Sequence, residues 1–169
     1  MTEGLEDSLV TMVDEKLARA PTFKLSPGLS VHWYEPGDEN MWIAIHEVAD
    51  KYNKVTRRLF FDQFPANGPS LHDRQCFLMD DRGQAIATGT AWAEVRGRFA
   101  GYGRVHWIAV LPASQGRGVG KMLMSLVCRR LLSLGHTRAF LTTDLRRPSA
   151  IRLYEKFGFT IDNIEERDE

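Results

Sequence analysis

Three glycines at alternate positions, Gly116, Gly118 and Gly120, follow an apolar strand-like segment and open a segment with helical periodicity. Glycine lets the backbone approach a ligand closely, and the first N–H groups of a helix have no partner within it. Those N–H groups and the positive end of the helix dipole suit a pyrophosphate. The stretch from Val110 to Lys121 therefore predicts a site for a phosphorylated cofactor.

The spacing of this stretch differs from that of two common nucleotide-binding loops. A P-loop requires a glycine five positions before Gly120 and a Ser or Thr after Lys121, where the chain has Gln115 and Met122. A dinucleotide-binding GxGxxG fingerprint requires its last glycine at the position of Lys121. Both alternatives fail on the residues present.

The pattern that fits is Q/R-x-x-G-x-G/A, formed by Gln115, Gly118 and Gly120, and it resembles the acetyl-CoA loop of the GNAT N-acetyltransferase superfamily. A second segment, from Ala150 to Phe159, is similar to the A-x-x-L-Y-E-K-x-G-F segment of the same family. The resemblance runs from about Leu29 to Ile164. It implies an N-acetyltransferase that moves an acetyl group from acetyl-CoA to a primary amine by direct attack in a ternary complex.

The resemblance also implies where acetyl-CoA binds. The strand before the loop splays from its neighbour in the family and pairs with the pantetheine arm, which maps onto Ile108, Ala109 and Val110. The Val110 N–H is then the candidate oxyanion donor, and such donors commonly lower a barrier by about 3–4 kcal/mol. The pyrophosphate is assigned to the backbone of Gln115, Gly116, Arg117, Gly118, Val119, Gly120 and Lys121.

Direct attack requires a neutral amine, whereas an alkyl ammonium with a pKa of about 10.4 is mostly protonated at neutral pH, so a base is needed. His106 stands where serotonin N-acetyltransferase, a member of the superfamily, carries a strand histidine, and it is the leading candidate. The alternative is a histidine that packs beside Trp107 or forms a hydrogen bond within the sheet.

Glu94 is the second candidate base, and the alternative for it is a solvated carboxylate at the end of a strand. Tyr154 matches the family tyrosine that protonates the leaving thiolate, with a core aromatic as its alternative.

The acceptor amine is left open by the sequence. Phe99 and Tyr102, in the loop before the glycine-loop strand, are the candidate substrate contacts. The family often has Asn where this chain has Arg147, so that cofactor contact is in doubt, and the arginines there are either phosphate ligands or a solvated loop. The chain also ends ten residues after Phe159, which leaves little room for a final strand. A partner chain that completes the sheet, or a shortened sheet, would each satisfy this.

The elements that must position these residues follow from periodicity and turn residues. We expect strands at about 29–34, 76–79, 84–94, 104–110, 137–143 and 159–164, and helices at about 40–52, 54–64, 118–134 and 149–157. This order predicts an α+β fold with a central mixed, mostly antiparallel sheet flanked by helices. Residues 1–25 form an N-terminal arm, expected to be helical because Leu5, Leu9, Met12, Val13 and Leu17 share one helical face, with a frayed tail as the alternative. The family resemblance implies that residues 26–169 form the acetyltransferase domain.

Composition limits the classes of function. The 169 residues carry 22 basic and 22 acidic side chains, and this balance does not favour a nucleic-acid partner. No apolar run is long enough to span a membrane, and Cys76 and Cys128 show no metal-ligand spacing, so we expect a cytoplasmic protein with buried thiols and no metal. The expected partner is a small-molecule or peptide amine, and a homodimer is an open alternative.

Two further hypotheses come from other classes of protein. The same loop would serve a non-catalytic acyl-CoA-binding or regulatory module, for which Tyr154 and His106 would be dispensable. The N-terminal arm would serve an assembly component in which the CoA site is secondary.

Overall fold

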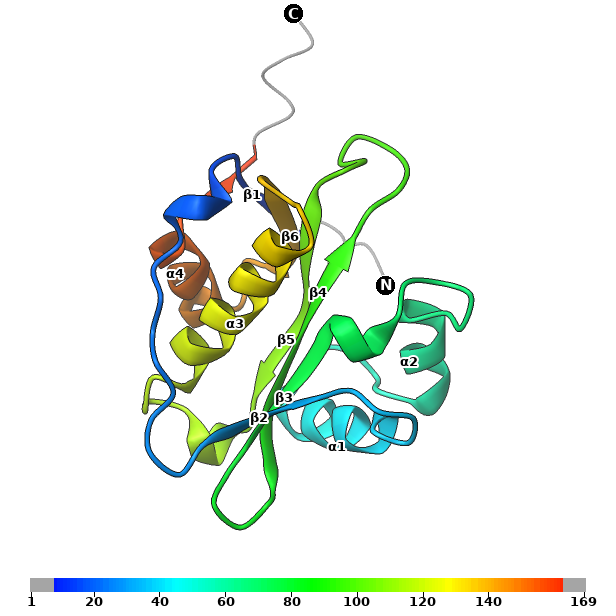
Figure 1. The fold of residues 1–169 in the computed structure, drawn as a ribbon, viewed down its shortest axis with the longest axis vertical. Coiled ribbons are helices and arrows are strands. Elements are labelled where there is room, and N and C mark those ends of the chain that lie inside the picture. Colours follow the sequence, from blue (N-terminus) through cyan, green and yellow to red (C-terminus); the bar gives the residue numbers. More distant parts are fainter. Residues whose placement is uncertain (1–7, 163–169) are drawn as a thin grey trace, which may run out of the picture.

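A mixed seven-stranded sheet forms the centre of the computed structural model, which describes residues 8–162 (Figure 1). The strand order is β2-β3-β4-β5-β6-β1-β7. The described strands are β1 (Leu9–Asp14), β2 (Ser30–Trp33), β3 (Gln75–Met79), β4 (Ala85–Ala93), β5 (Gly103–Val110), β6 (Ala139–Asp144) and β7 (Thr160–Ile161). Neighbouring strands are antiparallel except β5 and β6, so the predicted fold class is confirmed.

Helices cover both faces of the sheet (Figure 1). On one face lie α3 (Val119–Ser133) and α4 (Pro148–Lys156), and on the other lie α1 (Glu39–Ala49) and α2 (Arg57–Gln63). Short 3-10 turns occupy Leu17–Arg19, Leu71–Asp73 and Pro112–Ser114. Each helix pair buries its own apolar cluster against the sheet, and both cysteines are buried as expected.

The prediction of an N-terminal helix is wrong for residues 9–14. These residues form β1, which pairs with β6 from Leu9↔Asp144 to Asp14↔Ala139 and with β7 through Met12↔Ile161. Their apolar spacing fits a helix, but Val10, Thr11 and Val13 are β-branched, and the strand supplies backbone partners that the edge of β6 would otherwise lack. Leu5, which belonged to the same prediction, lies outside the described residues.

In the described part of the chain, β1 lies between β6 and β7 at one side of the sheet. The strand β7 is described at Thr160–Ile161. Met12 and Leu17 are fully buried in the larger apolar cluster, where Phe23 and Leu25 pack as well. Residues 9–25 are therefore an integral part of the fold and not a separate arm.

Candidate active site

The central feature is an opening between the two parallel strands. β5 pairs with β6 only at Gly103↔Ala139 and Arg104↔Phe140, and no further pairing follows toward Val110. Because the N–H of Leu111 donates to the carbonyl of Ile86 at 2.9 Å, the preceding Val110 directs its N–H away from β4. The N–H of Val110 therefore faces the opening. This is the geometry expected for a strand that pairs with an extended ligand.

A bulge interrupts β5 midway along this opening. Thr88 pairs with Ala109 and Thr90 with His106, so Trp107 and Ile108 both lie opposite Gly89. Trp107 has a φ of 51°, a conformation that costs a non-glycine residue on the order of 1–3 kcal/mol. A Cβ at Gly89 would lie 2.6 Å from Cδ1 of Ile108 and 3.0 Å from Cγ2 of Val127, so these side chains would have to move to admit a larger residue. The bulge thus sets the direction of the backbone from Ile108 to Val110.

The glycine loop has the conformation that its sequence predicts. Gly116 and Gly118 have φ angles of 80° and 76°, and Gly118 precedes the first residue of α3. No side chain caps this helix, so the N–H groups of its first turn, at Val119, Gly120 and Lys121, stay available. The Gln115 amide donates to the carbonyl of Val110 at 3.2 Å and ties the loop to the strand end.

Two ammonium groups interact with each other, and one of them, Lys121, lies directly behind the loop and 5.6 Å from the ring centre of Phe23. Lys121 in the first turn of α3 lies close enough to Lys156 at the end of α4 to lower the pKa of Lys156 below its ordinary value. Like charges at this distance repel each other in the free protein. An anionic ligand at the loop would relieve that repulsion.

The opposite rim of the opening is held by an ion pair. Asp50, which caps the end of α1, accepts from the Arg147 guanidinium at 2.8 Å, and its carboxylate also accepts from Tyr52 and Asn53. Burial opposes the charge of Asp50, but these hydrogen bonds and the charge of Arg147 outweigh it and lower its pKa. Arg146 binds Asp144 at 2.6 Å and lies 3.9 Å from the ring centre of Tyr52. Both arginines are therefore engaged within the protein.

Tyr154 projects from α4 on the other face of the sheet. Its side chain is 8% exposed, and burial raises its pKa to about 12, although the nearby charge of Arg147 acts in the opposite direction. The phenol therefore keeps its proton at neutral pH. A protonated phenol can donate a hydrogen bond.

His106 faces α1 and α2. Its ring lies 5.6 Å from that of Phe64, and the residue is 7% exposed. Burial, followed by the charges of Arg104 and His46, lowers its pKa well below 6.5. The imidazole is neutral at pH 7, which is the form that a base requires.

His46, on the last turn of α1, belongs to the same aromatic cluster. Its ring centre lies 4.2 Å from that of Trp42 and 5.3 Å from that of Trp107. The side chain is buried, and its Nε2 has no hydrogen-bond partner among residues 8–162. Burial lowers its pKa to about 4, against smaller opposing effects of Asp50 and of a hydrogen bond with the Trp107 backbone.

The comparisons with known proteins agree with this geometry. Residues 39–159 match the model of the acetyltransferase (GNAT) family. The chain belongs to this family. Mycothiol acetyltransferase of Streptomyces avermitilis is 30% identical over 141 aligned positions, and the match covers 80% of this chain and 44% of that protein. The protein of the same name from Amycolatopsis mediterranei is 30% identical over 169 residues, covering 93% of this chain and 56% of that protein. The chain thus spans about half the length of these relatives.

Solved structures of GNAT proteins share the fold. The GCN5-related N-acetyltransferase from Sphaerobacter thermophilus superposes with a TM-score of 0.72 at 21% identity, covering 92% of this chain and 48% of that one. A GNAT acetyltransferase from Colwellia psychrerythraea gives 0.68 at 12% identity, covering 91% of this chain and 52% of that one. At these identities the likeness concerns the fold.

Three of the residues predicted for the GNAT site lie at the other end of β5. Glu94 binds Arg104 at 2.9 Å, beside the last paired position of β5 and β6. Phe99 stacks on Phe140 at 4.3 Å, and the Tyr102 hydroxyl donates to Glu15 at 2.9 Å. The structure does not bring these residues to the Val110 end of the opening.

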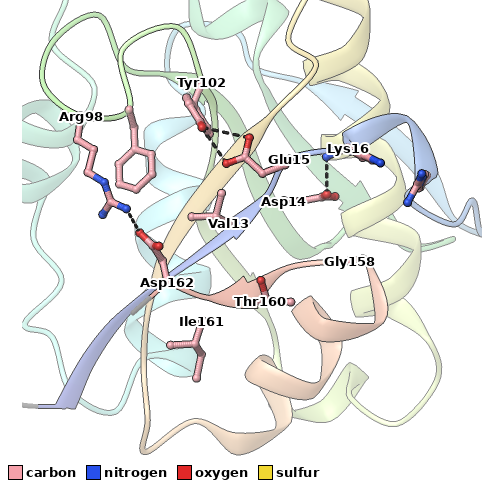
Figure 2. Close-up of a pocket in the computed structure, with 12 residues that line it drawn as sticks. Val13, Asp14, Glu15, Lys16, Arg98, Tyr102, Gly158, Thr160, Ile161 and Asp162 are labelled. Atoms are coloured by element: carbon pink, nitrogen blue, oxygen red, sulfur yellow. Dashed lines mark hydrogen bonds and ion pairs between the residues drawn. The ribbon is translucent and has the colours of Figure 1, made fainter. Parts of the chain in front are cut away.

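Phe99 and Tyr102 instead line a separate cavity of about 900 Å³ (Figure 2). Its walls come from the end of β1, the loop before β5, and β7, and the Arg98–Asp162 ion pair bridges two of them (Figure 2). None of the glycine-loop residues lines this cavity. Acceptor contacts at Phe99 and Tyr102 would therefore require an acceptor that reaches well beyond the opening.

The sequence analysis missed His46 and Asp50. The sequence around Asp50 has a recognisable signal, since an Asp just past a helix, followed by Tyr52 and Asn53, is typical of an Asx turn. His46 follows Trp42 by one helical turn and was indistinguishable from an ordinary helix residue.

Within the described part of the chain, none of the helices has the length and apolar character that a membrane crossing requires. In that same part, no group of His, Cys, Asp or Glu side chains could hold a metal ion.

Proposed function

We propose that this protein is an acetyl-CoA-dependent N-acetyltransferase that transfers an acetyl group to a primary amine by direct attack. The observation that carries the proposal is the opening between β5 and β6, which ends at an uncapped helix behind a glycine loop. The family membership and the names of the relatives support the reaction class. The acceptor is proposed only as a small-molecule or peptide amine.

The residues present fit acetyl-CoA. The Gln115 N–H already donates to the carbonyl of Pro112 at 3.3 Å. The uncapped N–H groups of Val119, Gly120 and Lys121 and the ammonium groups of Lys121 and Lys156 suit its phosphates. The backbone of Ile108, Ala109 and Val110 suits an extended pantetheine arm, because this edge has no β6 partner. When bound, acetyl-CoA supplies an acetyl group that is activated as a thioester.

The chain's own groups supply the remaining chemistry. The Val110 N–H is directed so that it can donate to a carbonyl oxygen in the opening, and such a fixed donor favours developing negative charge. His106, neutral at pH 7, is the proposed acceptor of the amine proton, directly or through water. Tyr154 holds a proton at neutral pH and is the proposed donor to the leaving sulfur.

A non-catalytic acyl-CoA-binding module is the second candidate. It is favoured by the burial of His106 among aromatic rings and by the Arg104 partner of Glu94, which leave the two candidate bases without an open path to an acceptor. Such a module would bind acetyl-CoA through the same loop without releasing CoA.

The first experiment is the melting temperature with and without acetyl-CoA. At about 100 times the dissociation constant, binding adds about 2.7 kcal/mol of stability. For a chain of this size each kcal/mol corresponds to about 2–4 °C. We expect a clear shift with acetyl-CoA and none with NAD or ATP, and the absence of any shift would overturn both candidates.

The second experiment separates enzyme from binding module. We expect CoA release with at least one member of an amine panel, which includes mycothiol-type small molecules because of the relatives' name. Tyr154→Phe should then lower kcat and leave acetyl-CoA binding intact, whereas Tyr34→Phe is the matched control, because Tyr34 follows the edge strand β2 and its hydroxyl donates to Glu39 at 3.0 Å. Binding without turnover on the whole panel would favour the module.

A further inference from the structure

The bulge in β5 places two neighbouring side chains on the same face of the sheet. His106 and Trp107 both contact aromatic rings of the cluster that α1 and α2 bury against the sheet. Successive residues of a regular strand point to opposite faces instead. Beyond the bulge the alternation resumes, because Ala109 packs in the α1–α2 cluster and Val110 in the cluster of the other face.

The extra residue of the bulge decides which way the Val110 N–H points. Val110 lies opposite Ala87, and the N–H of Leu111 donates to the carbonyl of Ile86 at 2.9 Å. If β5 lacked the extra residue, Val110 would lie opposite Ile86 and its own N–H would donate to β4. The bulge therefore frees this N–H for the opening.

Trp107 has the strained backbone conformation in this bulge. Its φ of 51° is one that a bulky side chain keeps only where the surrounding structure fixes the residue. The indole N–H donates to the side-chain oxygen of Gln63 at 3.0 Å. The ring meets Trp42 and His46 edge-on, each at 5.3 Å between ring centres. These contacts fix the indole on three sides.

Gln63 is the last residue of α2 and is itself held in place. Phe60 and Phe64, on the same stretch of chain, are fully or almost fully buried. At the other end of the helix, the Thr56 side chain caps α2 by accepting from the N–H of Leu59 at 3.0 Å. An indole N–H can only donate, so the amide oxygen of Gln63 and not its nitrogen must face it. Gln63 is therefore a fixed acceptor.

The hydrogen bond is not a requirement for packing an indole in this cluster. Trp42 is fully buried, and its Nε1 has no partner among residues 8–162. Trp107 is only partly buried, so water could satisfy its N–H instead. A protein acceptor at this N–H adds orientation, which water does not.

Resting on the proposed acetyltransferase function, we infer that Gln63 is a positioning residue. Its side-chain oxygen holds the Trp107 indole, the indole holds the bulge, and the bulge directs the Val110 N–H into the opening. Gln63 acts through these contacts and does not touch the reacting atoms.

The test compares two substitutions at Gln63. Gln63→Leu keeps a side chain of similar size and removes the acceptor, whereas Gln63→Glu keeps an acceptor oxygen. We expect Gln63→Leu to lower kcat by up to about 100-fold, the scale of a misplacement of about 1 Å, with little change in acetyl-CoA affinity. Gln63→Glu should recover most of kcat. Because Trp107→Phe removes the same hydrogen bond from the donor side, adding Gln63→Leu to it should lower kcat no further.

Thr56→Ala is the matched control for the stability of α2. It removes the cap at the start of the helix and leaves the bond between Gln63 and the indole in place. Its kcat should stay near that of the wild type. A loss of kcat as large in Thr56→Ala as in Gln63→Leu would show that only the stability of α2 matters, and the inference would be overturned.

A second readout is independent of turnover. Trp107→Phe identifies the indole N–H resonance of Trp107 among those of the four tryptophans. In the free protein this resonance and the Val110 amide resonance should shift in Gln63→Leu, move back in Gln63→Glu and stay unchanged in Thr56→Ala. An unchanged Val110 resonance in a folded Gln63→Leu, or a kcat equal to that of the wild type, would also overturn the inference. If the wild type bound acetyl-CoA but transferred no acetyl group, the proposed function would fail, and the two resonances would still decide the role of Gln63.

Discussion

The carboxylate of Asp50 meets the guanidinium of Arg147 at 2.8 Å, and this ion pair joins the end of α1 to the start of α4. The helix α1 packs on β4 and β5, whereas Arg147 follows β6. The pair therefore connects the two sides of the β5–β6 opening at the point where the strands no longer hold each other. Arg147, which replaces the amide common in the family, thus has a structural role in this chain.

Arg147→Ala should destabilise the protein. The Asp50 side chain is 4% exposed, and it would keep its bonds from Tyr52 and Asn53 but lose its cation, so we expect a loss of about 1–3 kcal/mol. This corresponds to about 2–4 °C per kcal/mol in the melting temperature. Arg152→Ala is the control, because among residues 8–162 the Arg152 guanidinium bonds the exposed Ser149 of its own helix.

The same pair gives a pH dependence with a defined sign. The pKa of Asp50 is lower in the folded protein, so its contribution is present above its unfolded pKa of about 3.9 and is lost as the pH falls through the folded pKa. The difference in melting temperature between Arg147→Ala and the wild type should therefore shrink in acid. A difference that stayed constant into strong acid would contradict the ion pair.

The cofactor loop could be predicted from the sequence because its residues act locally. Glycines at Gly116 and Gly118 and a helix directly behind them fix the conformation within a few positions. The strand β1 could not be predicted, because the spacing of Leu9, Met12 and Val13 suits a helix as well, and only pairing with β6 and β7 decides between them.

The rest of the site depends on contacts between distant segments. Asp50 and Arg147 are 97 positions apart, and nothing near either residue indicates its partner. His106 and Trp107 both lie on the α1–α2 face of β5 only because of the bulge, which strict alternation along a strand would not give. Glu94 was predicted to be a candidate base because it lies at the end of a strand. Its position in the strand does not indicate that it forms an ion pair with Arg104.

Met12→Ala tests the place of β1 in the sheet. Met12 is fully buried in the core opposite Leu141, so its truncation should cost about 2–5 kcal/mol, measured by denaturant or thermal unfolding. Leu9, in the same strand, is 54% exposed, and Leu9→Ala should cost no more than about 0.5 kcal/mol. Equal effects of the two substitutions would argue for a different register.

His106→Gln tests the proposed base. We expect kcat to fall by about 100-fold or more, with acetyl-CoA binding unchanged, because the amide cannot accept the proton. Since the pKa of His106 lies well below 6.5, the wild-type rate should show no histidine titration at that pH. His136→Gln, at an exposed ring that bonds the Gly101 carbonyl, is the control. Wild-type turnover in His106→Gln would exclude His106 as the base.

The low pKa of His106 also predicts how the stability of the protein depends on pH. His106 binds a proton more weakly in the folded protein, so the unfolded state takes up more protons as the pH falls below about 6.5, and the wild type should lose stability there. The loss should be smaller in His106→Gln, as measured by melting temperature against pH.

Lys156→Ala should affect the free protein and the complex in opposite directions. In the free protein the Lys121 ammonium lowers the pKa of Lys156, which marks an unfavourable contact between like charges. Removing Lys156 should therefore leave the melting temperature of the free protein unchanged or slightly higher. If both ammonium groups bind the phosphates of acetyl-CoA, the same substitution should weaken cofactor binding severalfold, and added salt should reduce the difference in affinity.

Lys51→Ala, which removes an exposed lysine beyond α1, is the control for the loss of one positive charge. Equal cofactor affinity in Lys156→Ala and the wild type would remove Lys156 from the phosphate site, while the assignment of the α3 N–H groups would be judged separately by the acetyl-CoA melting shift.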